Sequence, residues 1–334
     1  MLGFLHYPSW LSPDIIPGLP LRWYGLMYVV AFAITYLLFR YQMKQRKIQA
    51  NDDLVINLFF WGIIGLLIGG RIVGTTVYDP THYYITHPWR IFWPFEGGHF
   101  VGLAGMSYHG GLLGAIIAIV IYGRSKKIDV LDWGDMLIAG VPLGYTFGRL
   151  GNFINGELWG RVTTLPWGMY YPHAERLSVH HAWVREIAEK VGIAITSPNQ
   201  MVNLPRHPSE LYEAFFEGIV LWLIIWFIFR KHKPFKGFVV GIYIVGYGFI
   251  RFILEYLREP DPGIGFPIHF QPLLERAHPA ELLNFTMGQI LCFLMMVGGA
   301  VYLLILNARF HRPATDEPHD TSRPSARRLR KKLK

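Results

Sequence analysis

The sequence predicts an all-α integral membrane protein of about seven transmembrane helices, and three observations support this prediction. Of the 334 residues, 52% are hydrophobic and only 16% are charged. A soluble globular domain would carry about 25% charged residues. Apolar runs close to the length that crosses a bilayer recur along the chain. The basic residues are concentrated in alternate connections between these runs, which is typical of a protein with one fixed orientation in a membrane.

Seven segments are apolar enough, or nearly long enough, to cross a bilayer. They cover residues 21–39, 54–76, 109–123, 133–151, 209–229, 237–257 and 287–306. The third segment is short, and the fourth and sixth carry charged residues at their ends. An ionisable side chain within a membrane is energetically costly, so we expect the charged ends of these segments to be functional.

Basic residues mark one side of the predicted bundle. Twenty of the 32 Lys and Arg residues lie in three short connections and in the C-terminal tail. The positive-inside rule therefore places the N-terminus outside and the C-terminus in the cytoplasm. We expect a transmembrane domain over residues 1–307, with a small outer loop domain at about 152–206. A basic, disordered cytoplasmic tail is expected at 308–334.

The formal net charge of +9 does not predict a nucleic-acid partner here. In a soluble protein this excess of basic residues would suggest one. In this chain the basic residues lie between apolar runs, so they favour membrane orientation and contact with anionic lipid.

Several ionisable side chains lie at the outer ends of the predicted spans, namely Arg71, His109, Arg149, Arg251, Glu255 and Arg258. Guanidinium groups bind phosphate through paired hydrogen bonds and keep their charge when buried. Several arginines beside a histidine therefore predict a phosphate site near the outer leaflet. No matching run of acidic residues is evident to pair all of these arginines. An ion pair with Arg251, one turn away, explains Glu255 as well as a functional role does. Arg71 could equally be a helix-end arginine that reaches to the interface.

Residues 148–160, with the sequence GRLGNFINGELWG, are the most informative segment of the chain. Four glycines among polar amides cannot continue a lipid-facing helix, because exposed backbone would be left without hydrogen-bond partners in hydrocarbon. We therefore expect the chain to unwind here against protein or into a polar cavity. A Gly-rich turn that closes a helix would explain the glycines. It would not explain Arg149, two amides and Glu157 together.

This segment resembles the signature of the bacterial prolipoprotein diacylglyceryl transferases, and further motifs follow in the order of that family. They are residues 21–28 (LRWYGLMY), 69–71 (GGR), 107–111 (SYHGG), 206–213 (RHPSELYE) and 246–258 (GYGFIRFILEYLR). The match covers nearly the whole chain except the tail and parts of the outer loops. The chain departs from the family by an insertion at residues 97–106, so the sequence does not define the path of this loop.

The resemblance implies an enzyme that transfers the sn-1,2-diacylglyceryl group from phosphatidylglycerol to the thiol of the lipobox cysteine of prolipoproteins. Glycerol 1-phosphate is released, in the first step of lipoprotein maturation. The implied partners are phosphatidylglycerol, the lipobox of the prolipoprotein signal peptide and membrane lipid, in the bacterial inner membrane. By motif position, Arg149 and Arg251 would bind the phosphatidylglycerol headgroup. The remaining functional positions are Tyr24, His109, Asn152, Glu157, Gly160 and Glu255, to which we add Arg71 and Arg258 as candidates for substrate binding.

The transfer needs a thiolate, which the cysteine of the substrate protein supplies. A thiol with a pKa of about 8.5 is only slightly ionised at neutral pH, so a base or a positive field is needed. We expect His109 to take the thiol proton, while Arg149 and Arg251 stabilise the charge on the departing phosphate. Alternatively, His109 donates a hydrogen bond to the phosphate and the arginines lower the thiol pKa. The displacement needs no cofactor and no metal, and no cluster has metal-ligand spacing.

Functions of other classes fit the sequence less well. A small-solute transporter or channel would use the same intramembrane charges, but the chain shows no internal repeat. A membrane-embedded hydrolase would need its own nucleophile beside a base, and no motif pairs one with a histidine. A lipid-binding scaffold would not need a histidine together with arginines. We expect Cys292, the only cysteine, to be a packing residue, and His207 to have a structural role.

Overall fold

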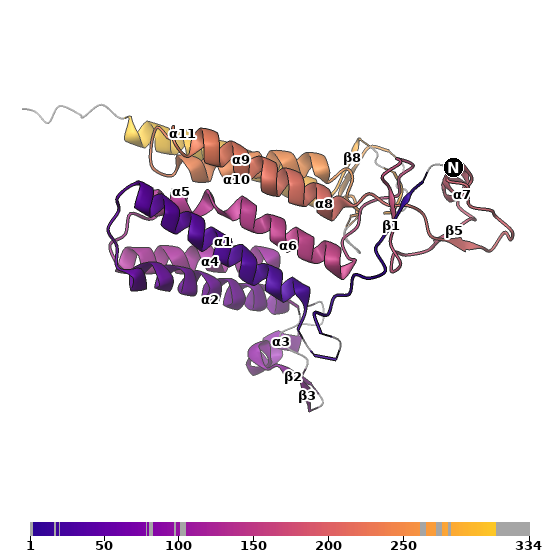
Figure 1. Cartoon of the computed structure of the whole chain (residues 1–334), viewed down its shortest axis with the longest axis horizontal. Helices are drawn as coiled ribbons and strands as arrows, with labels where there is room; N and C mark the ends of the chain where they lie inside the picture. Colours follow the sequence, from indigo (N-terminus) through magenta and orange to yellow (C-terminus); the bar gives the residue numbers. More distant parts are fainter. Residues whose placement is uncertain are drawn as a thin grey trace, which may run out of the picture.

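The computed structural model describes residues 3–16, 18–19, 21–77, 79, 83–96, 98–100, 105–260, 265–271, 276–279 and 282–311. Within these residues the chain is mostly helical, and the long helices lie roughly side by side along the longest axis of the molecule (Figure 1). Part of the inserted loop at 97–106 and most of the tail at 308–334 lie outside the described residues. The path of that loop and the disorder of the tail stay predictions.

The bundle contains both single helices and one composite helix. The single helices are α1 (Trp23–Gln45), α2 (Asp52–Thr76), α4 (Tyr108–Ser125), α5 (Val130–Ile138), α6 (Val141–Asn155), α10 (Phe238–Leu254) and α11 (Met287–Phe310). The composite helix consists of α8 (Ser209–Glu213), η2 (Ala214–Val220), α9 (Leu221–Ile224) and η3 (Ile225–Phe229). Its η2 and η3 stretches are π-helical. π-helical turns occur frequently at functional sites.

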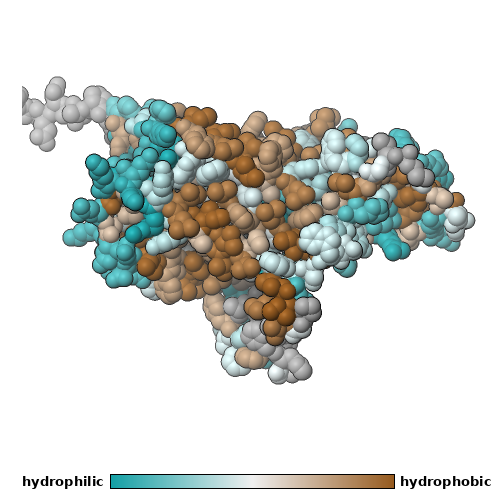
Figure 2. All heavy atoms as spheres, in the orientation of Figure 1, coloured by the Kyte–Doolittle hydropathy of each residue, from teal (hydrophilic) through white to brown (hydrophobic). Residues whose placement is uncertain are grey.

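Four of the described helices are long and apolar enough to cross a membrane: α1, α2, the composite helix and α11. Large apolar side chains on them point outward, as Val29 and Leu37 of α1 do at 62% and 63% exposure. Figure 2 shows hydrophobic residues across the middle of the bundle, and hydrophilic residues at the end where α1 leads into α2. An apolar surface of this extent is stable in contact with lipid. The chain is therefore a helical integral membrane protein.

Short strands and small helices connect the bundle helices. The strand pairs are β1 (Leu5–His6) with β4 (Met169–Tyr170), β2 (Phe95–Glu96) with β3 (His99–Phe100), β5 (Leu177–Ser178) with β6 (Met201–Val202), and β7 (Ile268–His269) with β8 (Asn284–Phe285). Only the first pair is parallel among those described. The α3 (Tyr83–Thr86) and η1 (Pro88–Phe92) helices project beside the bundle (Figure 1).

A second hydrophobic core lies outside the bundle, in the segment between α6 and α8. It joins α7 (Ala182–Lys190) to β5 and β6 through buried residues that include Leu177, Val184 and Val202. Ala277, from a connection much later in the chain, completes the same core. The limits of an outer domain at about 152–206 stay a prediction.

Glycines allow α2 and α4 to pack with their backbones in contact. A Cβ atom at Gly69 would overlap the carbonyl oxygen of Gly110 and lie 2.8 Å from Cα of Gly114. A Cβ atom at Gly114 would in turn lie 2.9 Å from Cα of Gly69. Small residues at such positions let membrane helices approach closely. This contact fixes α4, and with it His109, against α2.

The chain leaves its helix within residues 148–160, as expected, but Gly148 and Gly151 do not unwind it. Instead, α6 continues to Asn155 and ends at Gly156, which takes a left-handed conformation with φ of +63°. The helix tolerates Gly151 because this residue faces protein rather than lipid. A Cβ atom at Gly151 would lie 3.2 Å from Cδ2 of Tyr24 in α1. The first span also extends beyond its predicted end at residue 39, since α1 runs to Gln45.

Candidate functional site

Charged side chains from three helical segments meet around Glu213, the last residue of α8. Its Oε2 atom lies 2.8 Å from Nε of Arg149, which α6 supplies. Its Oε1 atom lies 2.6 Å from Nη1 of Arg251, near the end of α10. Arg258, which follows α10, donates a hydrogen bond from Nη1 to the same Oε1 atom at 3.4 Å. One carboxylate therefore joins three guanidinium groups.

Two further carboxylates complete the group. Glu217 accepts a hydrogen bond from the Tyr145 hydroxyl, and its Oε1 lies 3.5 Å from Nη1 of Arg251. Glu255 places Oε2 2.8 Å from Nη2 of Arg251, and its Oε1 accepts a hydrogen bond from the Thr286 hydroxyl at 3.0 Å. The ion pair that we considered for Glu255 is formed. We call these six residues the charged cluster: Arg149, Glu213, Glu217, Arg251, Glu255 and Arg258.

The arginines of the charged cluster are more accessible than its central carboxylates. The side chain of Arg149 is 17% exposed, and those of Arg251 and Arg258 are 12% exposed. The Glu213 and Glu217 side chains are 1% and 0% exposed. The carboxylates therefore lie behind the guanidinium groups. A molecule that approached the cluster would meet N–H donors first.

The contacts within the charged cluster leave hydrogen-bonding capacity unused. In the part of the chain that the structure describes, Nη1 of Arg251 is buried 2.6 Å from Oε1 of Glu213 but does not meet hydrogen-bond geometry. The same holds for three buried carboxylate oxygens of the cluster, Oε2 of Glu213, Oε1 of Glu217 and Oε2 of Glu255. Buried polar atoms are normally satisfied, so such an exception in a polar site suggests a ligand or water. The ion pairs of the cluster therefore do not use every donor and every acceptor in it.

Three residues at the end of α6 and just after it, Asn152, Asn155 and Glu157, extend the cluster. Nη1 of Arg149 donates a hydrogen bond to Oδ1 of Asn152 at 3.4 Å. Nδ2 of Asn152 then donates to Oε1 of Glu157 at 2.9 Å, and Nδ2 of Asn155 donates to the same oxygen at 3.1 Å. This chain of contacts fixes the side chain of Asn152. The arginine, the amides and the carboxylate that set this segment apart in the sequence thus form one network.

Gly160 lies where two backbone segments converge beside the cluster. Its N–H donates a hydrogen bond to the carbonyl oxygen of His207 at 2.8 Å, and the residue forms a β-bridge with Arg258. A Cβ atom here would lie 2.9 Å from Cβ of His207 and would overlap the carbonyl oxygen of Leu257. Only glycine fits this position without displacing the backbone next to Arg258.

Tyr24 lies on α1, against the same helix that carries Arg149. It packs at Gly151, and its hydroxyl shares a hydrogen bond of 3.0 Å with the hydroxyl of Tyr28. Tyr24 thus adjoins the α6 segment that also holds Asn152.

Arg71 lies on the α2–α4 pair and is 3% exposed. Its Nε donates a hydrogen bond to the carbonyl oxygen of Ile91, and its guanidinium lies 5.2 Å from the centre of the Tyr84 ring. These contacts tie α2 to the segment that contains α3 and η1. They are contacts to the protein itself, not those of an arginine that reaches to the interface.

His109 is exposed at the start of α4, with its ring centre 5.8 Å from that of Tyr108. Tyr108 in turn reaches toward α10, where its hydroxyl interacts with that of Tyr247. The Tyr247 ring lies 5.8 Å from the ring of Tyr145, which donates to the charged cluster. A series of tyrosines therefore connects the His109 segment with the arginines.

Comparison with known proteins decides the family. The sequence model of the family described as "Prolipoprotein diacylglyceryl transferase" matches residues 14–305. The chain belongs to the prolipoprotein diacylglyceryl transferase family. It is 49% identical to a phosphatidylglycerol–prolipoprotein diacylglyceryl transferase of Treponema denticola, over 92% of this chain and 95% of the relative. Relatives of the same name from Treponema pallidum and Chlorobaculum tepidum are 45% and 43% identical. The Treponema pallidum match spans 92% of this chain and 96% of the relative, and the Chlorobaculum tepidum match spans 88% and 89%.

Family membership confirms the resemblance seen in the motifs, and this transferase holds part of its motif residues in one place. The structure brings Arg149, Arg251, Arg258 and Glu255 together, with Asn152 and Glu157 attached through Arg149. It places Arg71 and His109 on the α2–α4 pair.

Glu213 and Glu217 were not predicted as site residues, and the expectation that no run of acidic residues pairs all of the arginines was wrong. The partners come from the composite helix, which is a different span from those that carry the arginines. Both are ionisable residues in an apolar segment, which is the feature that made Arg251 a candidate. Their spacing of one helical turn was the signal available.

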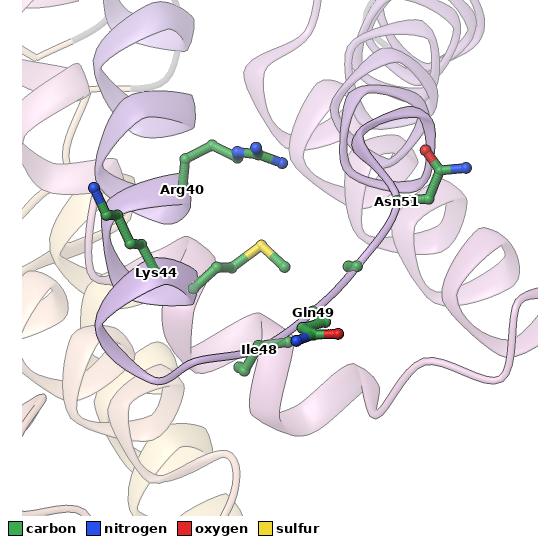
Figure 3. Close-up of a pocket in the computed structure, with 7 residues that line it drawn as sticks. Arg40, Lys44, Ile48, Gln49 and Asn51 are labelled. Carbon is green, nitrogen blue, oxygen red and sulfur yellow. The ribbon is translucent and has the colours of Figure 1, made fainter.

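The cavities of the transferase do not replace the charged cluster as a candidate site. A pocket of about 530 Å³ lies at the α1–α2 connection, lined by Arg40, Met43, Lys44, Ile48, Gln49, Ala50 and Asn51 (Figure 3). Its arginine, Arg40, is already paired with Asp52 at 2.5 Å. A groove of about 930 Å³ between α2 and α4 is mainly apolar. Among the described residues no group of His, Cys, Asp and Glu side chains could hold a metal ion.

Proposed function

We propose that this transferase moves the diacylglyceryl group of phosphatidylglycerol to the lipobox cysteine of a prolipoprotein. The printed names of its relatives state both substrates. In this step the sulfur–carbon bond forms at the diacylglyceryl carbon that carried the phosphate. The bond from that carbon to the phosphate oxygen breaks, and glycerol 1-phosphate leaves. The thiol proton passes to a base.

The convergence of Arg149, Arg251 and Arg258 is the observation that carries this proposal. The side chains of these arginines are partly exposed, at 12–17%, whereas the carboxylate that joins them is 1% exposed. A phosphate diester offers oxygens that guanidinium groups bind at two points. The phosphate gains negative charge as it leaves, so donors that are already in place stabilise the transition state more than the bound lipid.

His109 is our proposed base. The histidine is exposed at the start of α4, where a cysteine of a visiting peptide could reach it. In the alternative role, His109 donates a hydrogen bond to the phosphate, and the arginines lower the pKa of the thiol. The two roles differ in what a substitution by glutamine does.

The other motif residues would orient the lipid and hold the site together. We propose that Tyr24, Asn152, Glu157 and Glu255 contact the phosphoglycerol head, since amide and carboxylate oxygens accept hydrogen bonds from its hydroxyls. Arg71 would act from the α2–α4 pair, where it supports the segment before His109. Gly160 would act through backbone packing.

We further propose seven spans in the bacterial inner membrane, with the N-terminus outside and the C-terminus in the cytoplasm. The α5 and α6 helices would form one span together, and α4 and α10 would form two shorter ones. At the basic end of the bundle, Asp132 pairs with Arg46 at 2.9 Å and with Lys233 at 2.6 Å. An end rich in lysine and arginine favours the cytoplasmic side.

The test is a transfer assay with the purified protein, phosphatidylglycerol vesicles and a lipobox peptide that contains one cysteine. We expect the peptide to gain the mass of one diacylglyceryl group and glycerol 1-phosphate to appear. A peptide with serine in place of cysteine is the control and should stay unmodified. Solute uptake into proteoliposomes without any modified peptide would contradict the proposal and favour a transporter.

A further inference from the structure

Among the described residues, Glu213 is the one that forms ion pairs with all three arginines of the charged cluster. We propose that Glu213 is a positioning residue for the transfer, which holds the three guanidinium groups in place before the lipid phosphate binds. This inference rests on the proposed function, in which Arg149 and Arg251 bind that phosphate.

The contacts of Arg149 give the first argument. Its other partners are the Tyr145 hydroxyl, at 2.6 Å from Nε, and the Asn152 amide oxygen, at 3.4 Å from Nη1. Both are neutral. In the part of the chain that is described, Glu213 is the carboxylate that forms an ion pair with Arg149. Without Glu213, the direction of the Arg149 side chain would depend on neutral groups alone.

Repulsion between the arginines gives the second argument. Arg149 and Arg251 both lie within 3 Å of the same carboxylate, on opposite oxygens. Two guanidinium groups so close together repel each other strongly in a buried site, where solvent screening is weak. The charge of Glu213 offsets this repulsion and lets residues from α6 and α10 face one small volume.

The position of Glu213 gives the third argument. Its side chain is 1% exposed, whereas the arginines in front of it are 12–17% exposed. A lipid phosphate therefore approaches N–H groups, while the carboxylate stays behind them. This is the arrangement expected of a group that acts through the arginines and not on the substrate.

The same helix offers a matched control, Glu210, one turn before Glu213. Glu210 is fully buried as well, but its carboxylate accepts a hydrogen bond from the Tyr171 hydroxyl. It forms no ion pair among the described residues. The Glu210→Gln substitution thus changes a buried carboxyl group of α8 without removing an ion-pair partner of the arginines.

The experiment compares E213Q, E213D and E210Q with the unsubstituted protein in the phosphatidylglycerol transfer assay. We expect E213Q to lower kcat/KM for phosphatidylglycerol by about 100-fold or more, because misplaced donors no longer stabilise the leaving phosphate. E213D keeps the charge but falls short by one methylene, so we expect a partial loss of about tenfold. E210Q should stay within about threefold of the unsubstituted protein.

Thermal unfolding of each variant separates positioning from folding. If E213Q does not fold, E213D serves as the test, since it should unfold near the temperature of the unsubstituted protein and still show a lower kcat. A folded E213Q that transfers within about threefold of the unsubstituted protein overturns the role of Glu213. An equal loss of kcat/KM in E213D and E210Q also overturns the role of Glu213. Absence of transfer by the unsubstituted protein instead overturns the proposed function together with this inference.

Discussion

Arginine side chains within a membrane protein need partners, and each arginine of the charged cluster has a carboxylate within 3.5 Å. Three positive and three negative residues make up the cluster, so its formal charge is balanced. Removing one partner of a buried ion pair typically costs about 3–5 kcal/mol, because the other charge is left behind. The arginines are thus held where a phosphate can use them, and the carboxylates make their burial possible.

His109 is the residue whose chemical role is most open to a direct test. If it takes the thiol proton, His109→Gln should lower kcat at neutral pH by about 10²–10⁴-fold, with little change in KM for phosphatidylglycerol. Glutamine keeps a hydrogen-bond donor but cannot accept a proton at this pH. Steady-state transfer rates measure the effect. Near-normal transfer by this variant would reject the base assignment and support the hydrogen-bonding role.

The sequence predicted the arginines, the amides of α6 and Glu255, because each is a polar or charged residue in a segment that should be apolar. It did not predict their common partner. Glu213 and Arg149 are 64 positions apart in the chain and belong to different spans, and no local pattern relates them. Pairing between distant spans follows from helix packing, and a single sequence does not contain that information.

At the scale of the helices, glycine positions decide which elements can approach each other. The α2–α4 contact depends on Gly69, Gly110 and Gly114. The α1–α6 contact depends on Gly151, where Tyr24 packs. The sequence predicted the positions of the long helices within a few residues, since apolar length is a local property. It did not predict where within residues 148–160 the helix ends, because Gly151 packs against a separate helix that the local sequence does not reveal.

Gly69→Ala should destabilise the protein, because the added methyl group overlaps the backbone of α4. Overpacking of this kind costs about 1–3 kcal/mol, against a helix-propensity gain of up to about 1 kcal/mol. Gly298→Ala in α11 is the matched control, since nothing lies within 4 Å of its added Cβ atom. The free energies of unfolding of the two variants, measured in mixed detergent micelles, should shift in opposite directions from that of the unsubstituted protein. A stabilised Gly69→Ala variant would show that α2 and α4 do not pack as described.

On the scale of the whole molecule, a few buried contacts join the outer segment to the bundle. His207 is 8% exposed and links Gly160 and Arg161 to the start of the composite helix through backbone hydrogen bonds. Burial, together with the positive charge of Arg161, lowers the pKa of His207 from 6.5 to about 4. The structural role expected for His207 agrees with these contacts.

The stability of the protein should fall as the pH is lowered from about 6.5 to about 4. In this window the unfolded chain binds a proton at His207 that the folded protein does not, so acid favours unfolding. The contribution is at most about 3 kcal/mol for this shift. Unfolding free energies of the protein and of His207→Gln, measured across this pH range, check the expectation. An equal pH dependence in both would exclude His207 as a source of acid sensitivity.

Binding of the lipid phosphate by the arginines is the central claim, and transfer by the Arg149→Ala variant tests it most directly. This substitution leaves Glu213 paired with Arg251 and Arg258, so the cluster should persist and the protein should fold. We expect kcat/KM for phosphatidylglycerol to fall by about 10²–10³-fold, as for the loss of one donor to a developing negative charge. A folded Arg149→Ala protein that modifies the lipobox peptide as fast as the unsubstituted protein would contradict the claim.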